Sequence, residues 1–122
     1  MNDYNLSNTS SIRPSSRLLK IFTILCLFAY FLNCSDLLFT YTFLKTGYFY
    51  EFNPIMAPIV SYPIASLIIK IIIPACLIMH LISQLPKTAL AIIKIGIIFF
   101  IIITLFYFYI NYMHISYLFY IL

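Results

Sequence analysis

Three long apolar stretches, separated by short segments that contain polar residues or prolines, dominate this chain. They cover approximately residues 18–45, 63–83 and 88–111. Apolar runs of this length with few charges are typical of transmembrane helices, because about 20 residues are needed to cross the hydrocarbon core of a bilayer. The sequence therefore predicts an all-α integral membrane protein with three transmembrane helices and the lipid bilayer as its surroundings.

The last apolar stretch is longer than a single crossing requires. It begins near Thr88 and continues to Leu122, although a helix rising 1.5 Å per residue needs only about 20 residues for the bilayer core. This helix must tilt strongly, break, or finish as a segment at the membrane interface. We expect the change of character at Asn111, so the predicted span ends at residue 111.

The connection between the first two spans carries signals for turns and for a short helix. Gly47 can take the left-handed conformation that ends a helix. Asn53 followed by Pro54 is a helix-start signal. The prolines that follow limit this helix to residues 54–60, so we expect a short broken or re-entrant helix there. Pro74 should bend the second span.

The first 17 residues have a different composition from the rest. Residues 1–17 are rich in Ser and Asn and show no apolar periodicity, which predicts a disordered tail. A basic segment before an apolar run also fits a secretory signal sequence. The residues that follow Leu32 offer only a weak cleavage context, so we predict an uncleaved span and a single membrane domain over residues 18–122.

The basic residues predict the orientation in the membrane. One side of the predicted topology carries most of them, and only Lys45 flanks the other side; those on the first side are Arg13, Arg17, Lys20, Lys87 and Lys94. Cytoplasmic segments are enriched in Lys and Arg. We therefore expect a multi-pass protein of the cell membrane with a cytoplasmic N-terminus.

The overall composition excludes several classes of protein. Hydrophobic residues make up 64% and charged residues 8% of the chain, which leaves nothing for a separate soluble catalytic domain. The net charge of +4 comes from basic residues spread along the chain, so no nucleic-acid partner is indicated. The three cysteines lie in apolar segments and form no Cys-x-x-Cys pair. We interpret them as packing residues.

The few polar residues in or beside the predicted spans converge on one side of the membrane. Asn33, Asp36 and Thr40 share a helix face, because they are spaced i, i+3 and i+7. Lys70 in the second span lies at a depth similar to that of Asp36. The complete candidate site contains Asn33, Asp36, Thr40, Glu51, Asn53, Lys70, Asn111 and His114. Ionisable groups within a membrane usually face a protein interior and have a partner.

These motifs resemble a known family. The pattern Asn33-x-x-Asp36-x-x-x-Thr40, then Glu51-x-Asn53-Pro54, then a lysine in the next helix, is similar to that of small prokaryotic multi-span membrane proteins known as a domain of unknown function. The resemblance covers approximately residues 33–114. It implies the fold and an important polar set, and it implies no activity.

Several functions fit this polar set. The site could bind an ion or a small solute: the carboxylates could hold a cation, and no other cofactor is predicted. Transport would then require a homo-oligomer or another membrane subunit, since three spans make a poor conduit. Alternatively, an Asp36–Lys70 pair only locks helix packing in a structural or assembly protein. A holin-like pore former is a further alternative. An intramembrane enzyme is not favoured, because no nucleophile lies beside a histidine in a recognisable motif.

Overall fold

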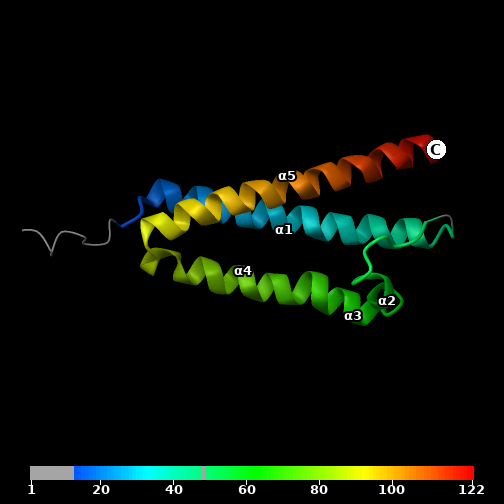
Figure 1. Cartoon of the computed structure of the whole chain (residues 1–122), viewed down its shortest axis with the longest axis horizontal. Coiled ribbons are helices and arrows are strands. Elements are labelled where there is room, and N and C mark those ends of the chain that lie inside the picture. Colours follow the sequence, from blue (N-terminus) through cyan, green and yellow to red (C-terminus); the bar gives the residue numbers. More distant parts are fainter. Residues whose placement is uncertain (1–12, 48) are drawn as a thin grey trace, which may run out of the picture.

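Three long helical segments lie side by side in the structure, a computed structural model that describes residues 13–47 and 49–122 (Figure 1). The elements, in chain order, are α1 (Ser16–Leu44), α2 (Ala57–Val60), α3 (Pro63–Leu67), a π-helical segment (Ile68–Ile72), α4 (Ile73–Gln84), a 3₁₀ turn (Leu85–Lys87) and α5 (Leu90–Ile121). Three segments are long and apolar enough to cross a membrane: Ser16–Leu44, Pro63–Lys87 and Leu90–Ile121. The described part of the chain contains no strand, so the prediction of an all-α membrane protein with three spans is confirmed.

The first helix begins earlier than the sequence suggested. The side-chain oxygen of Ser15 accepts a hydrogen bond from the backbone N–H of Leu18 at 3.3 Å, so it caps a helix that begins at Ser16. The last two residues of the expected tail therefore belong to α1, while residues 1–12 lie outside the described residues. At the other end, Gly47 has a φ of 74°, the left-handed conformation expected after a helix C-terminus.

The short helix in the connection is smaller than expected. Asn53 accepts a hydrogen bond from the N–H of Ile55 at its side-chain oxygen, at 3.0 Å, but α2 contains only Ala57–Val60. The reason lies in Pro58. The Ala57 N–H donates to the carbonyl of Asn53 at 2.8 Å and closes one turn. Pro58 has no amide hydrogen to donate to the carbonyl of Pro54, so the next α-helical bond is missing and the helix does not extend back to Pro54.

The last helix does not change character at Asn111. The side-chain amide of Asn111 donates to the carbonyl of Tyr107 at 2.8 Å and to the carbonyl of Leu32 on α1 at 3.1 Å. The side-chain amide of Asn111 therefore has hydrogen-bond acceptors inside the bundle and does not have to lie at the membrane–water interface. No glycine or proline follows Gly96, and α5 continues to Ile121, ten residues beyond the expected end at residue 111.

The central helix of the bundle is α1, which packs against α5 on one side and against the π-helical segment and α4 on the other (Figure 1). Six of its eight buried residues follow one another at steps of three, four or seven, the spacing of one helix face: Phe22, Cys26, Ala29, Asn33, Asp36 and Phe43. Most side chains of α4 and α5 are exposed, as expected for surfaces that contact lipid.

Pro74 changes the helix in a way that exposes one particular carbonyl. It has no amide hydrogen for the carbonyl four residues earlier, which belongs to Lys70. The chain widens into the π-helical segment Ile68–Ile72 directly before this proline. The freed carbonyl of Lys70 accepts a hydrogen bond from the side-chain amide of Asn33 at 2.5 Å. Pro74, which was expected only to bend the helix, therefore also frees a carbonyl that hydrogen-bonds to α1.

We expect Gly96→Ala to destabilise the contact between α1 and α5. A β-carbon at Gly96 would lie 2.6 Å from the ring of Phe22, which is 3% exposed and cannot move away freely. Overpacking of this kind costs about 1–3 kcal/mol. Titration with a denaturing detergent should show a lower free energy of unfolding for Gly96→Ala, and the added substitution Phe22→Leu should restore part of it. A double variant no more stable than Gly96→Ala would contradict this explanation.

Candidate functional site

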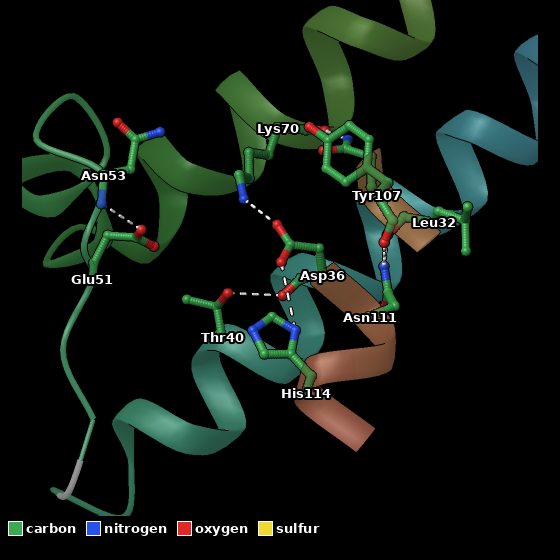
Figure 2. Close-up of polar contacts among 10 residues, drawn as sticks. Leu32, Asp36, Thr40, Glu51, Asn53, Lys70, Tyr107, Asn111 and His114 are labelled. Atoms are coloured by element: carbon green, nitrogen blue, oxygen red, sulfur yellow. Dashed lines mark hydrogen bonds and ion pairs between the residues drawn. The ribbon is translucent and has the colours of Figure 1, made fainter. Parts of the chain in front are cut away.

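An ion pair between two helices forms the base of the candidate site. The ammonium nitrogen Nζ of Lys70 lies 2.6 Å from Oδ2 of Asp36 (Figure 2). Both side chains are largely buried, with exposed fractions of 16% for Lys70 and 9% for Asp36. The sequence placed these two residues at similar depths along their helices, and in the structure their side chains are in direct contact.

His114 on α5 brings a third helix to this pair. Its Nδ1 lies 3.6 Å from Oδ1 of Asp36, the carboxylate oxygen that faces away from Lys70 (Figure 2). This nitrogen is buried and has no hydrogen-bond partner in the described structure. The imidazole ring packs against the rings of both Phe39 and Phe43, with centroid distances of 5.7 and 5.6 Å. A small shift of this ring would allow it to hydrogen-bond to the carboxylate.

The remaining polar residues of the three spans serve the helices themselves. The hydroxyl of Thr40 donates to the backbone carbonyl of Asp36 at 2.8 Å. Asn33 and Asn111 donate to backbone carbonyls on neighbouring helices. On the polar face predicted for α1, the neutral residues Asn33 and Thr40 therefore bond to backbone carbonyls. Asp36 is the residue of this face that pairs with a charged side chain, that of Lys70.

Glu51 and Asn53 belong to the connection after α1. Oε1 of Glu51 accepts a hydrogen bond from the backbone N–H of Asn53 at 3.0 Å (Figure 2). Asn53 in turn holds the N–H of Ile55 with its side-chain oxygen. This tight turn fixes the Glu51 side chain without help from the helices.

A cavity of about 730 Å³ joins the ion pair to this turn. Six of the eight residues predicted for the site line it, namely Asp36, Thr40, Glu51, Asn53, Lys70 and His114. Asn33 and Asn111 lie outside the lining. Ligand pockets in proteins typically measure about 300–1,000 Å³, so this cavity has the size of a site for a small molecule.

The walls of the cavity were not foreseen from the sequence. They are mostly aromatic and aliphatic side chains from α1, the connection and α5, and include Phe43, Phe49, Phe106, Tyr107, Ile110 and Met113. The sequence signal for these residues is only a general richness in aromatic side chains, which is also typical of helix packing and of membrane interfaces.

The chain belongs to the family DUF5658, a domain of unknown function, whose model matches residues 27–120. No curated protein and no solved structure matches the chain. The matched range contains all eight residues of the candidate site. Together with the three apolar helices, the match identifies a multi-pass membrane protein that contains a domain of unknown function.

The first prediction from this geometry concerns the ion pair. Asp36→Asn and Lys70→Met should each lower the free energy of unfolding by about 3 kcal/mol, because each leaves a buried charge without its partner. The double variant should lose less than the sum of the two. Titration with a denaturing detergent measures all four proteins of this cycle, and effects that add to within about 0.5 kcal/mol would mean that the pair does not interact.

A second cycle tests the carbonyl freed by Pro74. Asn33→Leu should cost about 1–2 kcal/mol, because it removes the side-chain donor to the partly buried carbonyl of Lys70. In a Pro74→Ala background the amide hydrogen of residue 74 can donate to the carbonyl of Lys70, so Asn33→Leu should lower the free energy of unfolding by less. The measurement is again the free energy of unfolding in detergent. An equal cost of Asn33→Leu in both backgrounds would show that Pro74 does not create the need for this amide.

Proposed function

We propose that this membrane protein binds a small solute in the cavity between α1, the connection after it and α5. The observation that carries the proposal is a pocket of about 730 Å³ with mostly apolar walls, whose polar groups include an ion pair at its base and a fixed carboxylate in the connecting turn. Apolar walls with a few fixed polar groups are typical of sites for small organic ligands.

The donor geometry favours an organic solute over a bare metal ion. One oxygen of Asp36 is already held by the Lys70 ammonium group. In the described part of the chain, no group of three or more His, Cys, Asp or Glu side chains is placed to hold a metal ion. A bound cation therefore remains a second candidate, and it would have to compete with Lys70 for Asp36.

We further propose that the cavity lies in the outer half of the cell membrane. The start of α1 and the turn between α4 and α5 lie at the same end of the bundle (Figure 1), and most basic residues belong to this end. The positive-inside rule would place it in the cytoplasm. The connection that carries Glu51 would then face the outside, and solutes would enter from there. Carriage across the membrane would need a second copy of the chain or another membrane subunit.

A structural role is the second candidate function. The short contact between Asp36 and Lys70 joins two helices in a buried environment, and the side-chain amides of Asn33 and Asn111 tie neighbouring helices to α1. In this alternative the ion pair locks packing within the bundle, and the cavity has no ligand.

Thermal unfolding of the purified protein in detergent distinguishes the two candidates. A panel of inorganic ions, amines, carboxylates and sugars would be tested by far-ultraviolet circular dichroism. A ligand that binds only the folded state at 100 times its Kd stabilises by about 2.7 kcal/mol. We therefore expect at least one organic member of the panel to raise the Tm of the wild type. Asp36→Asn should weaken this effect.

Two further variants make this result specific. Met113→Trp adds bulk at a residue that lines the cavity and leaves the ion pair in place, so it should abolish the ligand-induced shift in Tm. Ser35→Ala removes a hydroxyl from a neighbouring position outside the lining, where it donates to the carbonyl of Phe31, and should retain the shift. If no member of the panel raises the wild-type Tm, the structural role is the better explanation.

A further inference from the structure

The formal charges around the cavity do not cancel. Two carboxylates line it, on Asp36 and Glu51, against the single ammonium group of Lys70. With His114 neutral, the sum of two negative charges and one positive charge is −1. Asp36 holds Lys70 at 2.6 Å, whereas Glu51 forms no ion pair with any described residue. The carboxylate available to a charged ligand is therefore that of Glu51.

Aromatic rings line the same cavity as this carboxylate. Seven of the residues that line the cavity are aromatic: Phe43, Phe49, Tyr50, Phe52, Phe106, Tyr107 and Tyr117. Tyr50 and Phe52 flank Glu51 directly in the chain, and Phe49 lies two residues before it. The rings of Phe43 and Phe49 lie 4.9 Å apart and those of Tyr50 and Phe52 lie 4.7 Å apart. The faces of such rings attract organic cations, and several rings around one acidic group are the usual setting for binding a quaternary ammonium ion.

We infer that the solute is an organic cation, with its ammonium group at Glu51 and its apolar substituents among the aromatic rings. This assignment rests on the proposed function, because it names the class of ligand for the same cavity. The cavity already contains one example of this chemistry: the Lys70 side chain is an alkylammonium group held by a carboxylate. An inorganic cation would gain little from the apolar walls.

Glu51 is well suited to this role because its position does not depend on a ligand. The bond from the Asn53 N–H to Oε1 of Glu51 orients the carboxylate toward the cavity. The side chain is only partly buried, so its charge can remain hydrated until a ligand arrives. The substitution Glu51→Gln keeps a side-chain carbonyl for the Asn53 N–H and removes only the charge.

A fluorescence titration tests the charge preference. The chain has no tryptophan, so Phe52→Trp, at a cavity residue that is 82% exposed, supplies a single reporter. The protein would be held in dodecyl maltoside, a detergent without an ammonium group. The probes are choline, the uncharged analogue dimethylbutanol and the anionic analogue dimethylbutyrate, which share a similar branched carbon skeleton. We expect a saturable response to choline and weaker binding of the other two.

The matched variant is Glu51→Gln in the same Phe52→Trp background. It should weaken choline binding about tenfold and leave the binding of dimethylbutanol unchanged, with an unaltered far-ultraviolet spectrum. Equal choline affinity with and without the Glu51 charge would overturn the assignment, as would no saturable response to choline. Tighter binding of dimethylbutyrate would overturn the cation preference and still support solute binding. Failure of the wider thermal panel, by contrast, would remove the proposed function itself.

Discussion

The ion pair between Asp36 and Lys70 is the interaction on which the rest of the polar architecture depends. A charge within a membrane is costly unless it has a partner, so these two residues fix the relative depth of α1 and the second span. Lys70 reaches Asp36 from a π-helical segment that precedes Pro74. The same segment offers its free backbone carbonyl to Asn33. The ion pair and the hydrogen bond from Asn33 to the Lys70 carbonyl therefore join the two helices at the same depth.

The polar residues divide into two groups with different physical roles. Amide and hydroxyl side chains, such as those of Asn33, Thr40 and Asn111, donate to backbone carbonyls, and such contacts satisfy groups that lipid cannot solvate. The ionisable side chains instead face the cavity. Neutral donors can complete their bonding with the backbone alone, whereas a charge needs an opposite charge or water. This difference explains why Asp36, Glu51, Lys70 and His114 line the cavity.

The sequence predicted the parts of this structure that follow from local chemistry. Long apolar runs indicated the three spans, and Gly47 has the left-handed backbone expected of it. The continuation of α5 through Asn111 could not be foreseen, because it depends on the carbonyl of Leu32 from a distant helix. For the same reason, the spacing on α1 could not distinguish Asn33, which bonds to a backbone carbonyl, from Asp36, which pairs with the charged side chain of Lys70. The aromatic walls depend on how α1 and α5 pack, which hydropathy does not encode.

A structural role for the ion pair and a binding role for the cavity are compatible, because they make different demands on the two carboxylates. The unfavourable energy of an unpaired carboxylate rises with its burial. Asp36, which is almost fully buried, must carry its partner within the chain, and Lys70 supplies it. Glu51 lies at the connection and keeps partial contact with solvent, so it can remain charged without a partner. A buried pair that fixes the base of a cavity, together with a hydrated carboxylate at its edge, is the arrangement in which one acid stabilises the fold and the other is free to bind.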